Sequence, residues 1–443
     1  MSPLDRMRVG VPELSAVETD ETHPSTADVV IVGAGIIGVS TAFFLAQKGL
    51  SVIVFEKGQV AAEQSGRNWG WCRVQNRHPC EIPLMLHSFE LWDRMTEMTG
   101  EDVGFRRCAT LHLAESQDGA NRLRSWLELS AKYPVRVDLL NGVEIADKLP
   151  RAKPYEAGLF SVTEGRAEPQ LVTPALARAA RRLGVKIVSN CAAFDVITRN
   201  GKVEGVSGEG GRVACSRVLL AGGVWSSLLC RQLGLRLPQL RLHSTVCKVE
   251  PHPSIPDMSI IAPGFSIRPR INGGATLTIG LTAIAHIVPD SIRFFRDFLP
   301  VMRDRDAYGV RARIGQRFLK EMFGSVQRRL TRERIYDVSP YVPDIEAALA
   351  NIGNSLGLGD LSVDQVWAGE FDVTPDALPV IDEAPGCHGL FVSTGYSGHG
   401  FGLGPGAGHA TAELVSGGKP IVDLRPFRFD RFMQTTGTVT LVE

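Results

Sequence analysis

The sequence has no excess of charge of either sign, since its 443 residues carry 48 Lys and Arg against 48 Asp and Glu. A chain without a net electric field is not steered toward nucleic acid or an anionic membrane, so we expect partners to be chosen by local chemistry. The 8 cysteines contain no C-x-x-C pair and no zinc-like cluster. This usage is typical of reduced thiols in a cytosolic protein, and it predicts no metal site.

Long apolar runs are also missing, because no uninterrupted stretch reaches the roughly 18 residues that a membrane-spanning helix requires. Residues 1–26 mix acids, prolines and hydroxyls, which fits neither a secretory signal nor a membrane anchor. We expect this segment to be a flexible N-terminal tail. The expected location is the cytoplasm, with peripheral attachment to the inner membrane and oligomerisation both left open.

What remains is the composition of a globular protein, with 44% hydrophobic and 22% charged residues. A chain of 443 residues is longer than one compact core usually accommodates. The length therefore predicts two interlocked domains.

The stretch from Ala27, "ADVVIVGAGIIGVSTAFFLAQKGLSVIVFEKG", is typical of strand, helix and strand. Gly33, Gly35 and Gly38 form G-x-G-x-x-G, in which the three glycines serve a tight turn, close approach of the backbone to a pyrophosphate, and close helix packing. Glu56 ends the second strand, where an acid accepts hydrogen bonds from a ribose 2′-OH rather than facing a 2′-phosphate. The motif predicts a dinucleotide site and leaves FAD and NAD both open.

Glycines are unusually dense near the end of the chain, in "STGYSGHGFGLGPGAGHATAELVSGG". Each glycine loses much backbone freedom on folding, so this density needs a reason. Backbone N–H groups and a helix N-terminus aimed at an electron-rich ligand would supply one, and a plain long loop is the alternative.

Four motifs together carry a resemblance to a known family: "DVVIVGAGIIGVSTAFFLAQKGLSVIVFEK", "VLLAGGVWS", "DVTPDALPVID" and "TGYSGHGFGLGPGAG". In this order they resemble the D-amino-acid oxidase superfamily, on the branch of glycine oxidase, sarcosine oxidase and D-amino-acid dehydrogenase. The resemblance implies FAD and oxidation of a C–N bond by hydride transfer to flavin N5, which gives an imine. The substrate would be an amino acid or a secondary amine.

The resemblance also implies an α/β (α+β overall) fold, in which a doubly wound Rossmann-type FAD-binding domain carries an inserted antiparallel-sheet substrate domain. The segments 27–80, 156–240 and 356–432 would form the FAD-binding domain. The segments 81–155 and 241–355, where alternating stretches such as "FSIRPRINGGATLTIGL" predict a sheet, would form the substrate domain.

Carried over residue by residue, the resemblance assigns the glycine motif to the pyrophosphate, Glu56 to the ribose and the loop from Ser65 to the pyrophosphate and ring. Trp69 would wall the ring or pack in the core, and Ser65 and Arg67 would contact phosphate. The full set of expected cofactor contacts is Gly33, Gly35, Ile36, Gly38, Glu56, Lys57, Ser65, Gly66, Arg67, Asn68, Trp69, Gly70, Ala193, Gly222, Trp225, Gly398, His399, Gly400, Phe401 and Gly402.

Departures from the family pattern refine these expectations. Covalent relatives attach the flavin through a cysteine at the position of Gly369 or through a histidine in the loop 65–71, and this chain has neither. We therefore expect non-covalent FAD. Thr278 stands where sarcosine oxidase has a lysine that helps oxygen react, so a dehydrogenase passing electrons to a quinone or an electron-transfer protein is favoured. A hydrogen-peroxide-forming oxidase and a flavin-bound scaffold subunit of a hetero-oligomeric dehydrogenase are the alternatives.

Arginine is the best residue for clamping the carboxylate of an amino acid. Arg268 and Arg270 in "FSIRPR" are the candidates, with a solvated sheet face as the alternative role. Tyr341 is a candidate hydroxyl contact.

His399 is a candidate for proton handling, or else an ordinary loop histidine. Glu370 and Asp372 stand where D-amino-acid dehydrogenases commonly have other residues. They would pair a cationic amine or anchor a turn, which leaves the charge of the substrate open.

Overall fold

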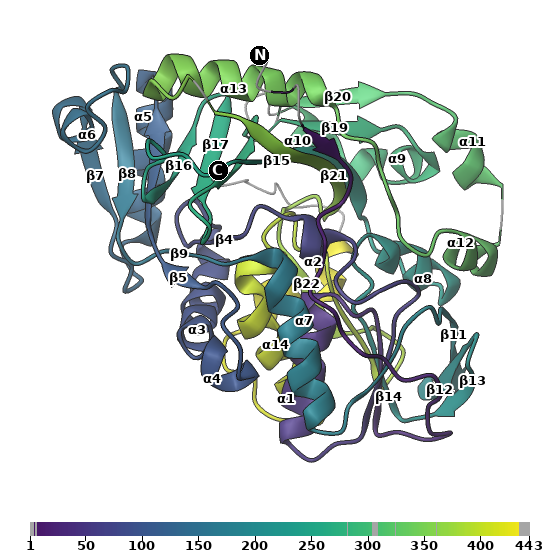
Figure 1. The fold of residues 1–443 in the computed structure, drawn as a ribbon. Helices are drawn as coiled ribbons and strands as arrows, with labels where there is room; N and C mark the ends of the chain where they lie inside the picture. The colour runs from purple at the N-terminus through teal and green to yellow at the C-terminus, as the bar shows by residue number, and fades with distance from the viewer. Residues whose placement is uncertain are drawn as a thin grey trace.

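The computed structural model describes residue 4 and residues 7–280, 282–303, 309–323, 325–359 and 361–433, and two large sheets organise this part of the chain. Figure 1 shows a six-stranded sheet with α1, α7 and α14 in the lower half of the molecule, and an eleven-stranded sheet beneath α13 in the upper half. The segments between them supply most of the loops discussed below.

The six-stranded sheet is parallel except for its edge strand β22. Alternate residues of its β-branched strands enter two different cores: Val29 and Ile31 pack toward α1 and α14, whereas Val30 and Val32 pack toward the opposite layer. Parallel strands that are buried on both faces have nearly continuous apolar sequences, as these strands do. The doubly wound fold is confirmed. Its order is β10 (Lys186–Val188), β3 (Val52–Phe55), β2 (Val29–Val32), β14 (Arg217–Leu220), β23 (Leu390–Thr394) and β22 (Val380–Glu383).

The eleven-stranded sheet is mixed and mostly antiparallel. The predicted antiparallel sheet beside the Rossmann-type sheet is thus confirmed. Its main path is β1 (Arg8–Val9), β21 (Val363–Val373), β15 (Leu240–Val249), β18 (Ala275–Thr278), β17 (Phe265–Pro269), β16 (Met258–Ala262), β6 (Ala109–Ala114), β8 (Ala157–Ser161) and β7 (Asp138–Asn141), with β19 (Ala283–His286) and β20 (Val310–Arg313) branching from β15. Two three-stranded sheets complete the strands: β11 (Ala193–Arg199), β12 (Lys202–Gly208) and β13 (Gly211–Ala214), and then β4 (Trp71–Cys72), β9 (Gly165–Arg166) and β5 (Arg106–Arg107).

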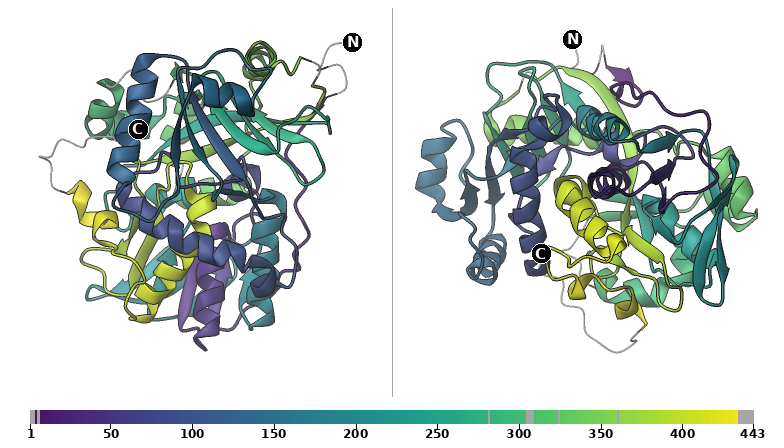
Figure 2. Two further views of the ribbon diagram at one scale, coloured as in Figure 1. Left: turned by 90° about the vertical axis from the view of Figure 1, so that its left-hand side faces the viewer. Right: turned by 90° about the horizontal axis from the view of Figure 1, so that it is seen from below.

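Helices cover the outer faces of both sheets, as the views of Figures 1 and 2 show. The longer ones are α1 (Ile36–Gln47), α3 (Ile82–Asp93), α5 (Gln117–Ser130), α7 (Pro169–Arg182), α10 (Phe295–Arg303), α13 (Val342–Leu356) and α14 (Gly400–Ser416). The shorter ones are α2 (Gln64–Arg67), α4 (Met95–Thr99), α6 (Gly142–Lys148), α8 (Ser226–Gln232), α9 (Pro289–Arg293), α11 (Arg317–Met322) and α12 (Val326–Arg332), with 3₁₀ turns at Pro79–Glu81, Gly223–Trp225, Arg425–Phe427 and Phe429–Phe432.

The glycine-rich stretch near the end of the chain forms a helix, α14, rather than a long loop. A Cβ added to Gly404 would lie 2.7 Å from Ile36 of α1, and Cβ atoms on Gly406 and Gly408 would meet Ser88 of α3 and Ser40 of α1. The glycines within the helix therefore allow close packing against two neighbouring helices.

The segment predicted as a flexible tail packs against the protein from residue 7 onward. Arg8 and Val9 form β1 beside β21, and the backbone N–H groups of Ser15 and Asp20 donate to Gln170 and Ile187 (3.1 and 2.7 Å). These backbone hydrogen bonds hold an otherwise polar stretch in place, so the prediction of a flexible tail is wrong for residues 7–26.

The two sheets divide the chain almost as the predicted domains do. The six-stranded sheet takes its strands from the three segments assigned to the FAD-binding domain, but β8 and β21, from the same segments, lie in the eleven-stranded sheet. β21 pairs with β15 along nearly its whole length. We keep the two-domain division as a proposal, with β8 and β21 moved to the substrate side.

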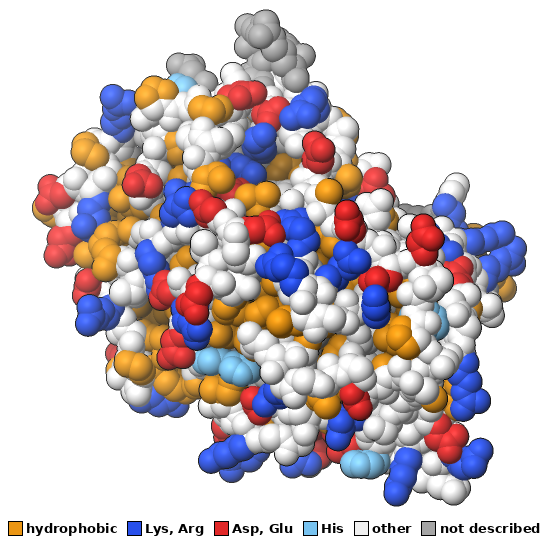
Figure 3. Space-filling view, turned by 60° about the horizontal axis from the view of Figure 1, so that its bottom comes forward, with side chains coloured by type: hydrophobic (Ala, Val, Ile, Leu, Met, Phe, Trp, Pro, Cys, Tyr) orange, Lys and Arg blue, Asp and Glu red, His pale blue; other side chains and the backbone are white. Residues whose placement is uncertain are grey.

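Charges are intermixed on the surface, as expected from the balanced composition. On the face drawn in Figure 3, basic and acidic side chains alternate without a broad field of one sign. In the part of the chain that the structure describes, no helix combines the length and apolarity needed to cross a membrane.

Candidate active site

A continuous cavity of about 810 Å³ lies where the two large sheets face each other. On one side it meets the carboxyl ends of β2, β3 and β14, at Val32, Phe55 and Ala221. On the other side it meets Ser244 of β15 and Ser266 of β17. Ligands of doubly wound sheets bind at the carboxyl ends of the strands, beside the point where the strand order reverses, and this cavity has that position.

The glycine motif forms one wall of the cavity. Gly33 has a φ of 108°, and a Cβ on it would lie 2.6 Å from the Ala221 carbonyl, so only glycine fits this turn. The Ile36 N–H, at the start of α1, donates to Ser65 Oγ (2.9 Å). A helix N-terminus beside a hydroxyl is suited to an anionic phosphate. Gly38 lies outside the cavity lining and packs against Gly33.

Glu56 stands at the end of β3 and lines the cavity. Its carboxylate accepts hydrogen bonds from the backbone N–H groups of Ala34 (2.9 Å) and Gly58 (2.8 Å). Burial raises the pKa of Glu56, and these two hydrogen bonds oppose that shift. A carboxylate has about four acceptor sites, so a ribose hydroxyl can be bound in addition to the two backbone groups.

The segment Glu333–Asp337, which we call the strap, crosses the cavity near Glu56. Lys57 Nζ donates to the carbonyls of Glu333 (2.7 Å) and Arg334 (2.8 Å). The Arg334 guanidinium donates a hydrogen bond to the Lys57 carbonyl (3.2 Å) and forms an ion pair with Glu209. Arg334 and Ile335 line the cavity, so the strap forms part of its wall near Glu56.

Trp225 and Arg67 line the cavity but are held by the protein. The Trp225 indole N–H donates to Glu63 Oε2 (3.0 Å), and Lys57 lies over its ring. The Arg67 guanidinium donates to the Ala62 carbonyl (2.8 Å) and to Asp337 (2.9 Å) of the strap. Protein acceptors therefore account for Arg67, in place of the predicted phosphate contact.

Two segments meet at the far end of the cavity, which we call the ring end. One is the loop Asn68–Trp71, shaped by a hydrogen bond from the Gly70 N–H to Asn68 Oδ1 (2.8 Å). The other is the start of α14, where Gly398, His399, Gly400 and Phe401 line the cavity. A Cβ on Gly402 would lie 3.1 Å from the Trp71 carbonyl, so the two segments are in contact.

His399 at the ring end has a partner that the sequence patterns do not indicate. Its Nδ1 lies 3.1 Å from each carboxylate oxygen of Glu81, which is fully buried. Burial and Arg77 lower the pKa of His399, and Glu81 opposes them. Burial alone would raise the pKa of Glu81, but His399 and Arg77 lower it. A His399 tautomer with its Nδ1–H donating to the Glu81 carboxylate agrees with this contact and with the lowered pKa of the imidazole, and it leaves Nε2 as a base.

Beyond the ring end the cavity continues into a basic lobe, lined by Arg73, Arg77, Arg122 and His112. Arg122 is exposed to solvent, whereas Arg77 is 3% exposed. Burial lowers the pKa of His112 to about 3, and the two arginines Arg73 and Arg122 act in the same direction. The lobe is therefore suited to an anionic group. No sequence pattern predicted this lobe, although Arg73 and Arg77 lie in "CRVQNRHP", directly after the predicted loop.

Buried Glu164 positions this lobe. Its carboxylate accepts hydrogen bonds from the N–H groups of Val74 (2.6 Å) and Gln75 (3.1 Å). The Trp126 indole N–H donates to the Arg77 carbonyl (2.8 Å) at the other end of the same loop. The backbone between Arg73 and Arg77 is thus fixed from both sides.

Arg268, Arg270 and Tyr341 do not line the cavity. Arg268 is fully buried and pairs with Glu168 (3.2 Å), to which Arg270 also binds (2.6 Å). Tyr341 lies beneath the guanidinium groups of Arg311 and Arg313. The predicted carboxylate clamp at Arg268 and Arg270 is therefore wrong, because strand alternation turns these side chains behind the cavity wall.

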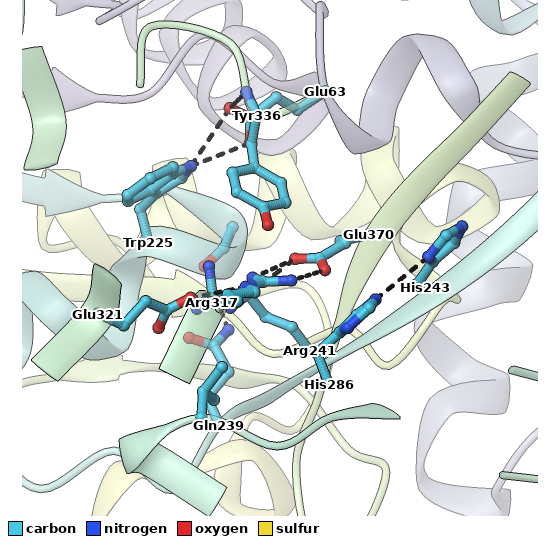
Figure 4. Close-up of polar contacts among 12 residues, drawn as sticks. Glu63, Trp225, Gln239, Arg241, His243, His286, Arg317, Glu321, Tyr336 and Glu370 are labelled. Carbon is cyan, nitrogen blue, oxygen red and sulfur yellow. Dashed lines mark hydrogen bonds and ion pairs between the residues drawn. The ribbon is translucent and has the colours of Figure 1, made fainter. Parts of the chain in front are cut away.

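Glu370 and Asp372 both line the cavity, but their carboxylates are bound by other groups of the protein. Arg317 forms a double ion pair with Glu370, whose second oxygen also lies 3.8 Å from Arg241 Nε (Figure 4). Asp372 accepts hydrogen bonds from the Gly395 N–H (2.8 Å) and the Gln239 amide (2.7 Å), while burial raises its pKa. Of the two roles left open by the sequence, anchoring agrees with these contacts.

The cavity brings together most of the predicted cofactor residues. Gly66 and Gly402 lie outside the lining, like Gly38. The predicted cofactor residues that line the cavity are Gly33, Gly35, Ile36, Glu56, Lys57, Ser65, Arg67, Asn68, Trp69, Gly70, Ala193, Gly222, Trp225, Gly398, His399, Gly400 and Phe401.

A Rossmann-type sheet, a glycine turn at its switch point and a long cavity shared with a second sheet define a dinucleotide-dependent enzyme class. The chain belongs to the FAD-dependent oxidoreductase family, whose family model matches residues 28–414. This finding confirms the resemblance drawn from the four motifs, and FAD as the cofactor.

Individual relatives are amine and amino-acid oxidoreductases. The chain is similar to the L-amino acid deaminase from Proteus myxofaciens, solved in complex with anthranilate, with 29% identity and a TM-score of 0.88 over 96% of this chain and 97% of that one. It is 27% identical to the sarcosine oxidase subunit beta of Rhizobium meliloti over 91% of this chain and 88% of that protein. It is 24% identical to the mitochondrial sarcosine dehydrogenase of Mus musculus, of which it spans 42%.

The cavity fits FAD on the observations above. The turn at Gly33 has no room for a side chain, the α1 N-terminus faces a hydroxyl, and Glu56 stands where a ribose would lie. The same cavity continues for a second, ring-bearing end between Trp69 and Gly400. When bound, FAD would supply the two-electron acceptor for the reaction.

Proposed function

We propose that the chain oxidises the C–N bond of an amino acid, primary or N-alkylated, with non-covalent FAD as the electron acceptor. The observation that carries this proposal is the joining of the ring end to a basic lobe within one cavity. An amino acid needs both a place for its reacting C–N bond and a cationic partner for its carboxylate.

The basic lobe would hold the carboxylate. Arginine binds carboxylates through paired, charge-assisted hydrogen bonds. Arg73 and Arg77 line the lobe, and the charges of both lower the pKa of His399, which supports their position near it. The Proteus myxofaciens relative was solved with anthranilate, which carries a carboxylate and an amine. That ligand supports a substrate with the same two groups here.

His399 would take the proton of the substrate ammonium through Nε2. A neutral imidazole held by a carboxylate can act as a general base, because its second ring nitrogen keeps a free lone pair. Glu81 fixes the ring through Nδ1, so its role is to position the base. Removal of the proton leaves the amine lone pair free to form the imine as the carbon loses hydride.

A dehydrogenase is the form of the activity that we propose, with a quinone or an electron-transfer protein as the acceptor. Thr278 lies in buried β18 outside the cavity lining, and Lys57 is the only lysine lining the cavity among the described residues. Lys57 is bound to Glu63 (2.8 Å) and to the strap. Among the described residues, the ring end of the cavity therefore has no lysine in its lining that could assist the reaction with oxygen.

Anaerobic mixing of the purified yellow protein with a panel of D-, L- and N-methyl amino acids tests the proposal. Loss of the yellow absorbance with at least one amino acid is expected, whereas no bleaching by any of them would favour the flavin-bound scaffold subunit. With the active substrate, hydrogen peroxide formed at the rate of dye reduction would replace the dehydrogenase with an oxidase. Yellow colour retained in an acid-precipitated pellet would contradict non-covalent FAD.

A further inference from the structure

Arg268 and Arg270 belong to a buried cluster whose charges are not balanced. Arg166 of β9 adds a third guanidinium group that acts electrostatically on Arg270, and Glu168 is the carboxylate paired with Arg268 and Arg270. Their exposed fractions are 0% for the Arg268 side chain and 3% for the Glu168 side chain. The cluster thus carries two more positive than negative charges.

Several of its N–H groups have no acceptor. Arg268 Nε, and Nε and Nη1 of Arg166, are buried and find no hydrogen-bond partner among the described residues. The other Arg268 nitrogens donate to Glu168 (3.2 Å) and to Thr276 Oγ1 (3.0 Å). Buried, incompletely paired cations are costly, and such groups cluster where a protein needs a charge for function.

Neighbouring acids do not cancel this excess. Asp364 is paired with Arg8 (2.8 Å) and Lys248 (2.6 Å) on the surface side. Glu164 interacts with Arg73 and Arg77 on the cavity side, and burial raises the pKa of its carboxyl to about 7. Burial lowers the pKa of Arg270 to about 10, and Arg268 and Arg166 act in the same direction against Glu168.

Gly70 separates the cluster from the ring end of the cavity. A Cβ on Gly70 would lie 2.8 Å from Arg268 Cζ and 2.9 Å from Nε, so its α-carbon rests directly on the guanidinium. Gly70 also has a φ of 79°, which L side chains rarely adopt. Arg166 pairs across strands with Trp71, the next residue of the same wall. The cluster therefore lies one backbone thickness behind the cavity.

We propose that Arg166, Arg268 and Arg270 act through the Gly70 wall as an electrostatic support for the reduced flavin. Hydride transfer adds two electrons and one proton to the ring, so the ring gains one negative charge. Fixed cations in a buried site stabilise a developing anion without any rearrangement. This inference rests on the proposed position of the ring end beside Gly70.

Sulfite is a suitable probe, because its addition to an oxidised flavin also places a negative charge on the ring and bleaches the yellow colour. In the purified holoenzyme, Arg268→Met is expected to raise the sulfite Kd by about tenfold, less than the loss of a directly contacting donor. Glu168→Gln, which adds to the positive excess, is expected to lower the Kd. Arg106→Met is the matched control, since Arg106 lies on neighbouring β5 with its side chain 50% exposed, and no change is expected.

The midpoint potential of the bound flavin is a second, independent measure of the effect of the arginine cluster. It is expected to become more negative in Arg268→Met and more positive in Glu168→Gln. Should Arg268→Met fail to fold, Arg166→Met carries the same expectation with fewer hydrogen bonds lost. Unchanged sulfite Kd and potential in folded, flavin-loaded variants would overturn the inference. Neither measurement uses an amino-acid substrate, so the inference and the proposed function can fail separately.

Discussion

Two groups of arginines lie on opposite sides of the wall Trp69–Trp71, and they differ in their surroundings. Arg73 and Arg77 line the cavity on a loop that Glu164 holds by its backbone. Arg268 and Arg270 lie behind the wall and share the carboxylate of Glu168. Arginine is therefore suited to substrate binding on the cavity side and to an electrostatic role behind the wall. The neighbouring carboxylates differ accordingly: Glu164 binds the backbone of the loop that carries Arg73 and Arg77, whereas Glu168 binds the side chains of Arg268 and Arg270.

The largest effect is expected from His399→Ala, which removes the proposed base on the cavity side. A general base contributes about 10²- to 10⁴-fold, so the rate of anaerobic flavin reduction should fall by at least about 100-fold. Stopped-flow absorbance measures this rate. A loss below tenfold at unchanged flavin content would remove His399 from proton handling.

The pH dependence of the same rate sharpens the role of Glu81. Because burial and Arg77 lower the pKa of His399, the imidazole is neutral at pH 7, and the rate should fall only as pH drops below about 6.5 and the base becomes protonated. Glu81 raises that pKa, so Glu81→Gln should move the acid limb to lower pH while reducing the maximal rate. An unmoved limb would show that Glu81 has a structural role only.

Arg73→Met and Arg77→Met test the cavity side of the comparison. Loss of a charge-assisted carboxylate contact should raise the substrate Kd for flavin reduction by about 10- to 100-fold, with a smaller change in the limiting rate. Arg268→Met is the matched control, because it removes the same charge from behind the wall and should leave this Kd within about threefold. Equal effects of all three substitutions would contradict the division of roles.

At the opposite end of the cavity, Arg334→Ala should release the strap. Its guanidinium bonds to the Lys57 carbonyl and to Glu209, so its loss should speed FAD dissociation by about tenfold, as expected for one or two charged hydrogen bonds. The fluorescence of released FAD measures the rate. Arg328→Ala, at an exposed position of α12, is the control and should match the unmodified protein. An unchanged rate in Arg334→Ala would show that the strap does not retain the cofactor.

The smallest effect is expected at Arg122, which lines the basic lobe and is exposed to solvent. Exposed charges are screened by salt, so Arg122→Met should lower kcat/KM by a factor of about two to five at low ionic strength and by less at 0.5 M salt. Steady-state rates at two salt concentrations measure this. A loss that does not depend on salt would assign Arg122 a contact rather than a steering role.

The cofactor half of the site could be predicted from the sequence because its signals are local. Gly33, Ile36 and Glu56 lie within one strand–helix–strand unit, and backbone geometry fixes where each must stand. The β-branched runs predicted buried parallel strands, since the two faces of such a sheet are both covered.

The substrate half depends on long-range contacts that the sequence does not display. Glu81 contacts His399, which is 318 positions away in the sequence, and Glu168 pairs with Arg268 and Arg270, which are about 100 positions away. A one-residue alternation decides which face of a strand an arginine occupies, and the pattern "FSIRPR" does not show which face is the cavity. Likewise, the glycines of α14 serve helix packing that becomes visible only beside α1 and α3.

The most direct test of the central claim is anaerobic titration of the flavin with the amino acid that bleaches it, in parallel for the unmodified protein, Arg73→Met and Arg268→Met. We expect saturable bleaching, a higher substrate Kd in Arg73→Met, and an unchanged Kd with a slower limiting rate in Arg268→Met. A raised Kd in Arg268→Met together with an unchanged Kd in Arg73→Met would contradict the assignment of the two arginine groups.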